Sequence, residues 1–180
     1  MEIVQEAEMM KLLAVIRDED VGLISKKSGL TKKRSAARTI LIKGKTIALL
    51  NVTKDKHHKL PGGGLEGREK IKEALYREIL EETGCKIKII GEVGKIMEYR
   101  SLFDLIQTSF CYIATVVKEG KPQFDEGERK AGFKLEWIGM NSAMKLLKKE
   151  KPATYDGKFI IIRDLKFIEA AKKLITPDKR

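Results

Sequence analysis

The sequence predicts one layered domain of the α/β (α+β) class, in which helices flank a mixed central sheet. Runs rich in β-branched and aromatic residues alternate with stretches whose apolar residues recur at helical spacing, and glycine or proline separates most of them. Hydrophobic residues make up 42% of the 180 residues and charged residues 35%, which is the balance of a globular chain, and the length is enough to bury a sizeable core. Helices and strands in alternation favour a sheet covered by helices.

The N-terminal part is expected to be an extension of the domain. Residues 1–33 are predicted to contain a short helix at 4–14, followed by a polar and turn-rich segment. The globular domain is expected over residues 34–180, with helices at its C-terminal end. It begins with two buried strands between residues 35 and 52, which a tight turn at Gly44 joins.

A loop with Pro61 and three successive glycines comes next, and a helix from about residue 69 to residue 83 then ends at Gly84. Trp137 alternates with apolar neighbours and is expected in the core. The remaining elements are predicted as two antiparallel strands at 85–101 and 104–117, a polar loop at 118–132, a strand at 133–139, a helix at 142–150 capped by Asn141 or Ser142, and a final helix near 158–175.

The net charge narrows the classes of partner, and the positions of the cysteines indicate whether they are free. A net charge of +11 attracts anions such as nucleotides, nucleic acid or acidic lipid. The lysines are spread along the chain, which favours a solvated surface, so RNA binding stays open without a motif to support it. Acids precede the short apolar stretch at the N-terminus, so we expect a cytoplasmic protein without a membrane partner. Cys85 and Cys111 lie in apolar runs and are predicted to be buried free thiols.

The predicted helix after the glycine loop carries an unusual set of acids. Glu78, Glu81 and Glu82 are spaced by three and four residues and share one face, in the direction that a core helix gives to apolar groups. They lie in the last turns, where the helix dipole favours positive charge. A Mg²⁺ ion bound by these oxygen ligands would compensate both the carboxylates that face the core and their place at the negative end of the helix dipole. The alternative is a solvated acidic face that pairs with lysines. Residues 62–64, all glycine, leave room for a metal or a phosphate and favour the first interpretation.

The same region matches a known signature: Gly, five residues, Glu, seven residues, Arg-Glu, an apolar residue, any residue, Glu-Glu, any residue, Gly, apolar. The matching positions are Gly63, Glu69, Arg77, Glu78, Ile79, Glu81, Glu82, Gly84 and, in the last apolar place, Cys85. The sequence therefore resembles the Nudix hydrolases, and the layout of residues 34–150 is similar to theirs. The resemblance implies a Nudix-type α/β/α sandwich and a Mg²⁺-dependent enzyme, with Mn²⁺ as a substitute metal.

The resemblance also implies roles for individual residues. Glu78, Glu81, Glu82 and the carbonyl of Gly62 would bind the metal, and Arg77 would orient the carboxylates. Glu69 belongs to the motif, but helical geometry would put it on the opposite face from Glu78, so we expect a structural or outer-shell role for it. Two sets of residues are left as candidates: Glu78, Glu126 or Glu128 for the general base, and Arg38, Lys59, Gly63 and Gly64 for contacts with the substrate.

The resemblance leaves the substrate open, since accessory residues of the subgroups are absent. A small nucleotide is the expected substrate: the phosphoanhydride of a nucleoside diphosphate derivative would be cleaved, with nucleoside triphosphates ahead of ADP-ribose and RNA 5′ ends. A non-catalytic nucleotide-binding module is the competing class. A homodimer is a further hypothesis. His57 and His58 have no spaced metal-ligating partners, so we expect them to serve in a loop.

Overall fold

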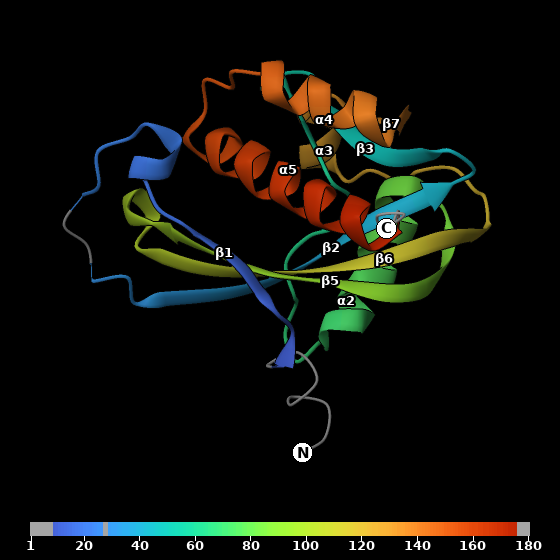
Figure 1. Ribbon diagram of the computed structural model, residues 1–180, viewed down its shortest axis with the longest axis horizontal. Helices are drawn as coiled ribbons and strands as arrows, with labels where there is room; N and C mark the ends of the chain where they lie inside the picture. The colour runs from blue at the N-terminus through green and yellow to red at the C-terminus, as the bar shows by residue number, and fades with distance from the viewer. Residues whose placement is uncertain (1–8, 27–28, 176–180) are drawn as a thin grey trace, which may run out of the picture.

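The computed structural model describes residues 9–26 and 29–175, and within them one mixed sheet of seven strands is flanked by helices (Figure 1). The strands are β1 (Leu12–Ile16), β2 (Lys32–Lys43), β3 (Thr46–Val52), β4 (His57–Lys59), β5 (Lys86–Arg100), β6 (Leu105–Lys118) and β7 (Phe133–Gly139). The helices are α2 (Ile71–Thr83), α3 (Glu126–Ala131), α4 (Met140–Lys149) and α5 (Tyr155–Ile175), with 3₁₀ turns at Glu19–Val21 and Ser101–Phe103.

The sheet combines parallel and antiparallel pairs, as predicted. Its order is β1-β5-β6-β2-β3-β4, and β7 pairs with β3. Strands β1 and β5 are parallel, as are β2 and β6, whereas the long β5 and β6 are antiparallel neighbours. The turn at Gly44, whose φ is 58°, joins β2 and β3. These two strands pair only beside that turn and then diverge, so that β3 continues against β7 and β4.

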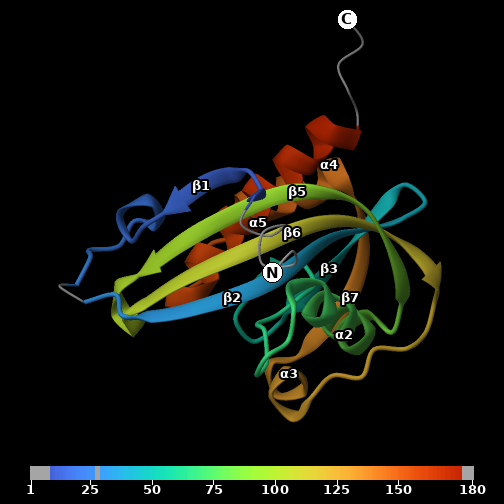
Figure 2. The ribbon, with the colours of Figure 1, turned by 90° about the horizontal axis from the view of Figure 1, so that it is seen from below.

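The sheet separates two hydrophobic cores, one on each face. Helix α2 covers one face, and α4 and α5 cover the other (Figure 2). The first core includes Ala74, Leu75 and Ile79 of α2 with Ala37, Leu41 and Tyr112 of the sheet, and the second includes Phe159, Phe167 and Ile168 of α5 with Ile40, Ile96 and Ile113. Trp137 is half-buried against the α2 core, and the free cysteines Cys85 and Cys111 are buried as predicted.

The N-terminal segment differs from the prediction. Residues 1–8 lie outside the described residues, but Leu12–Ile16 forms a strand where a helix was expected up to residue 14. This strand lies parallel to β5, and the Lys95 amide donates to the carbonyl of Lys11 at 2.8 Å. Helical periodicity is a local signal, whereas this pairing comes from a strand more than 80 residues later. The segment therefore adds a strand to the domain's own sheet.

Three helices differ from the prediction: α3 was not predicted, and α4 and α2 differ at their first residues. The polar loop at 118–132 contains the six-residue helix α3, which Asp125 caps by accepting from the Glu128 amide at 2.8 Å. A helix this short has too few turns to show apolar periodicity. Helix α4 begins at Met140 with Gly139 before it, so neither Asn141 nor Ser142 caps it. Helix α2 begins two residues later than predicted and ends at Gly84, whose φ is 70°.

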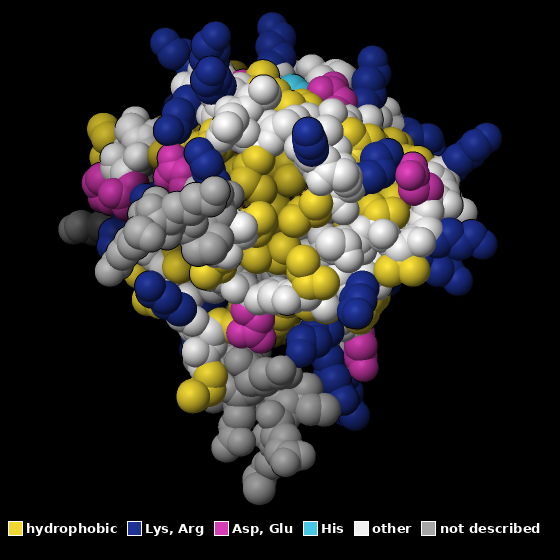
Figure 3. Space-filling model, turned by 45° about the vertical axis from the view of Figure 1, so that its right-hand side comes forward, with side chains coloured by type: hydrophobic (Ala, Val, Ile, Leu, Met, Phe, Trp, Pro, Cys, Tyr) yellow, Lys and Arg dark blue, Asp and Glu magenta, His cyan; other side chains and the backbone are white. Residues whose placement is uncertain are grey.

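The surface matches the dispersed charge of the sequence. On the face drawn in Figure 3, lysine and arginine side chains surround a central apolar area and do not gather in one patch. None of the helices in the described part of the chain has the length and apolar character needed to span a membrane.

His58 links three elements near the end of the sheet, in place of the loop role predicted for it. It belongs to β4, and its ring contacts Glu150, just after α4, and Glu136 of β7. Its amide also donates to Glu150 at 2.9 Å. Burial lowers the pKa of His58, but the carboxylates of Glu150 and Glu136 outweigh burial, so the net pKa is raised.

We predict that this cluster makes folding stability depend on pH. Because the folded pKa of His58 lies above its unfolded value of about 6.5, the extra stability is fully present below that unfolded value and is lost as pH rises through the folded pKa. Urea unfolding between about pH 6 and 9 should show a falling free energy of unfolding for the wild type and a flatter profile for His58→Gln. The matched variant His57→Gln should keep the slope, and an unchanged slope in His58→Gln would contradict the assignment.

Candidate active site

The glycine loop is fixed against β2 by its backbone. The amides of Ala37 and Thr39 donate to the carbonyls of Gly63 and Pro61 at 2.9 and 3.2 Å. Gly62 has a φ of 127°, and a Cβ there would lie 2.1 Å from the carbonyl oxygen of Ala37. This position therefore requires glycine, since any side chain would push the loop away from the strand.

Glu82 is buried beneath this loop. Its carboxyl is 1% exposed and accepts from the Gly62 amide at 2.5 Å and from the Lys59 ammonium at 2.8 Å. Burial raises the pKa of Glu82, and the ammonium of Lys59 offsets part of that rise. Lys59, expected to contact a phosphate, is thus paired with a predicted metal ligand, and its ammonium also lies 3.5 Å from the Gly62 carbonyl oxygen.

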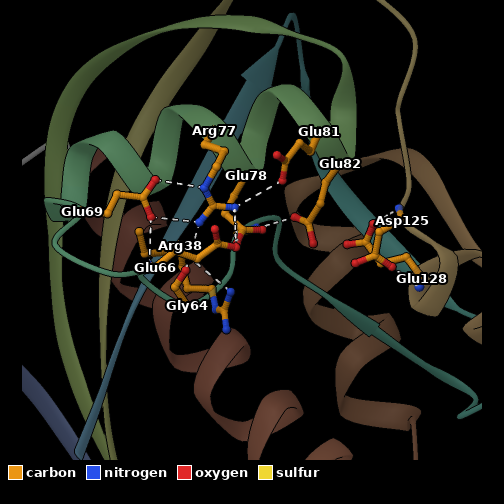
Figure 4. A network of polar contacts seen from close by, with 12 residues as sticks. Arg38, Gly64, Glu66, Glu69, Arg77, Glu78, Glu81, Glu82, Asp125 and Glu128 are labelled. Carbon is orange, nitrogen blue, oxygen red and sulfur yellow. Dashed lines mark hydrogen bonds and ion pairs between the residues drawn. The ribbon is translucent and has the colours of Figure 1, made fainter.

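Arg77 gathers the other acids of the motif (Figure 4). Its guanidinium donates to Glu69 at 2.9 Å, to Glu78 at 3.0 Å and to Glu81 at 3.2 Å. It also donates to the carbonyl of Gly64 at 3.1 Å, which joins the helix to the loop. Glu69 precedes α2 and shares this guanidinium with Glu78, so its predicted place on the opposite face of the helix was wrong.

Gly63 and Gly64 leave space for charged groups. A Cβ on Gly63 would lie 2.1 Å from a carboxylate oxygen of Glu78, so the absent side chain lets that carboxylate reach the loop. A Cβ on Gly64 would lie 2.5 Å from the guanidinium of Arg34, at the exposed start of β2. Sequence reasoning missed Arg34, although the basic run at 32–34 directly before the first long strand was an available signal.

Arg38 and Glu128 lie on different sides of this arrangement. Arg38 is buried, and burial followed by the nearby Arg163 lowers its pKa to about 10. It therefore lies under the loop and does not offer the phosphate contact predicted for it.

Glu128 of α3 lies beyond Glu82 (Figure 4), close enough to Lys59 and Glu78 for their charges to act on it, and burial raises its pKa. Glu126 pairs with Lys130 at 2.6 Å on the outer surface.

The donors at this site suit a hard divalent cation. Glu66, Glu69, Glu78 and Glu81 form ion pairs with Arg77, and Glu82 forms one with Lys59. Among the described residues, no three acidic, histidine or cysteine side chains converge closely enough to hold a metal as they stand; Glu82 pairs with Lys59, and Glu78 pairs with Arg77. Carboxylates and a backbone carbonyl are the ligands that Mg²⁺ prefers, and the buried Glu82 already has a cation as its partner.

Comparison with known proteins gives a family and several relatives. The family model described as NUDIX domain matches residues 32–159. Diphosphoinositol polyphosphate phosphohydrolase 2 of Mus musculus is 31% identical over 93 residues, which are 52% of this chain and 49% of that protein. Diphosphoinositol polyphosphate phosphohydrolase 3-beta of Bos taurus is 31% identical over 94 residues, 52% of this chain and 54% of that protein. The chain thus spans about half the length of the curated relatives it matches.

Solved structures share the fold at lower identity. The NUDIX hydrolase from Nitrosomonas europaea aligns with a TM-score of 0.58 and 18% identity, covering 78% of this chain and 91% of that one. The Ap4A hydrolase of C. elegans aligns with a TM-score of 0.55 and 14% identity, covering 79% and 98% of the two chains. Identities this low show a common fold alone. The shared fold confirms the Nudix-type α/β/α sandwich expected from the motif.

We predict that Arg77 stabilises the protein by neutralising the acids around it. Arg77→Gln should lower the free energy of unfolding by roughly 1–3 kcal/mol at neutral pH, as expected for lost hydrogen bonds to charged groups. The hydrogen bond from Arg77 lowers the pKa of Glu69, so its part of the loss should shrink as the pH falls through that lowered pKa. Urea unfolding of Arg77→Gln and of the exposed control Arg68→Gln tests this, and equal stabilities of the two variants at neutral pH would contradict it.

Proposed function

The chain belongs to the NUDIX family, and from that premise we propose that it hydrolyses a phosphoanhydride bond in a nucleoside diphosphate derivative, with Mg²⁺ as its metal and Mn²⁺ as a substitute. One observation carries the proposal: the buried carboxylate of Glu82 lies against the Gly62 loop, beside the carboxylates of Glu78 and Glu81 that Arg77 holds. Burying an acid at the C-terminal end of a helix is costly, because the helix dipole there is already negative.

The residues at this site divide the work of hydrolysis. Glu78, Glu81, Glu82 and the Gly62 carbonyl would hold the metal, and Arg77 keeps two of these carboxylates oriented. When bound, the metal neutralises charge on the bridging phosphates and lowers the pKa of a water molecule.

Phosphate binding and proton acceptance are the roles proposed for residues near the loop and in α3. The absent side chains of Gly63 and Gly64 let the Glu78 carboxylate and the Arg34 guanidinium reach the loop, and Arg34 would donate to phosphate oxygens of the substrate. Glu128, with its raised pKa, accepts the proton of the attacking water.

We propose two candidate classes of substrate. Nucleoside triphosphates are the first candidate, with ADP-ribose and RNA 5′ ends behind them. A diphosphorylated polyol phosphate is the second candidate, because the curated relatives bear the name diphosphoinositol polyphosphate phosphohydrolase and because Arg34 lies beside Gly64. Retention of all three metal-binding glutamates supports an enzyme over a binding module. The cytoplasmic location, the homodimer and RNA binding stay predictions.

The first experiment is product analysis with Mg²⁺ and a panel of nucleoside triphosphates, ADP-ribose, dinucleoside polyphosphates, nucleotide sugars, diphosphoinositol phosphates and 5′-triphosphorylated RNA. We expect one class to turn over, and Glu82→Gln to lower kcat by about 10²-fold or more because a group that stabilises the transition state is lost. The control is Glu73→Gln, an exposed acid on the first turn of the same helix, which should retain activity. No turnover across the panel would favour the binding module.

The general base can be separated from the metal ligands by comparing three variants. Glu128→Gln should lower kcat by about 10²–10⁴-fold and remove the acidic limb of the pH–rate profile, without weakening metal binding. Glu78→Gln should weaken metal binding as well as turnover. Glu126→Gln, which removes a charge from the outer side of the same short helix, should behave like the wild type. A full kcat in Glu128→Gln would transfer the role to Glu78.

A further inference from the structure

Lys59 has an unusual position for a lysine in a site that binds a cation. Its ammonium touches two of the four proposed metal ligands, at 2.8 Å from Glu82 and 3.5 Å from the carbonyl oxygen of Gly62. Its side chain is only 14% exposed and passes over the ring of Phe133, 4.9 Å from the ring centre. Lysine normally keeps its charge in water, so this burial needs the carboxylate as compensation.

The two carboxylate oxygens of Glu82 accept hydrogen bonds from different partners, so one bond can be replaced without the other. One oxygen accepts from the Gly62 amide, which belongs to the loop itself. The other accepts from Lys59, which reaches the carboxylate from the end of β4. A cation can therefore replace Lys59 on the second oxygen while the bond between Glu82 and the loop stays intact. The loop and α2 remain joined in either state.

We propose that Lys59 is a built-in competitor for the metal: its ammonium takes the place of the divalent cation between Glu82 and Gly62 and has to leave before the metal can use both ligands. This inference rests on the metal site of the proposed function. A lysine suits the task because it carries a single charge on a flexible stem, whereas the divalent ion brings twice the charge to the same oxygens.

Competition of this kind couples metal binding to the position of one side chain. In the metal-free protein, the ion pair stabilises the fold, since removing one partner of a buried pair leaves an uncompensated charge. The energy of the ion pair is subtracted from metal binding, so the affinity for the metal is lower than the ligands alone would give. Once displaced, the ammonium would lie near Glu128, whose pKa its charge acts to lower, and near the phosphates of a bound substrate.

The test measures metal binding directly, without turnover. Mn²⁺ is titrated into metal-free protein, and free Mn²⁺ is followed by electron paramagnetic resonance for the wild type, Lys59→Met and the control Lys54→Met. Lys54 is exposed on the preceding turn, so its removal changes the net charge equally. We expect Lys59→Met to bind Mn²⁺ about tenfold more tightly or better, within the usual range of coupling between sites, and Lys54→Met to bind like the wild type. Thermal unfolding in EDTA should show a lower Tm for Lys59→Met, which Mn²⁺ restores.

The possible outcomes separate this inference from the proposed function. Equal or weaker Mn²⁺ binding by Lys59→Met than by the wild type overturns the competition and leaves the metal site in place. A lack of Mn²⁺ binding in every protein refutes the metal site and the competition with it. If Lys59→Met does not fold, Lys59→Gln replaces it, since an amide can donate to Glu82 without carrying charge, and the same tighter binding is expected.

Discussion

The site depends on the backbone of the loop at residues 60–64, which three separate elements hold in place. Strand β2 pairs with it on one side, and Glu82 of α2 accepts the Gly62 amide. Asp164 of α5 accepts the Leu60 amide at 2.8 Å from the other face of the sheet. A loop without these partners would leave buried amides unsatisfied. Because each partner comes from a different layer, the loop is positioned only when the whole sandwich is assembled.

A buried network of charges lies behind Asp164 on the α5 side of the sheet. Arg163 donates to Asp164 at 2.7 Å and lies 3.5 Å from Glu98 of β5. Glu98 also accepts from Arg100 and Gln107 at 2.7 and 2.8 Å. Such groups are costly to bury singly, and their mutual pairing offsets the loss of water. Helix α5 therefore has two tasks: its apolar side builds a core, and its charged pair reaches the loop that carries Gly62.

On the other side of the loop, two cations bind the acids of the motif in separate groups. Arg77 holds Glu69, Glu78 and Glu81 near the surface, and Lys59 holds Glu82 in the interior. This separation explains how a helix tolerates so many carboxylates in its last turns, where its dipole is already negative.

The sequence by itself determined the layered fold, most strand and helix positions and the acidic motif, because these depend on local periodicity, on turn residues and on spacing along one helix. The resemblance also led us to expect that Arg77 orients the carboxylates, and Arg77 contacts Glu78 and Glu81. Only the tertiary structure decided that β1 joins the sheet, that Arg38 is buried, and that Lys59 pairs with Glu82. Each of these depends on partners many residues away, and a buried charge or an edge strand has no local signature until its partner is in place.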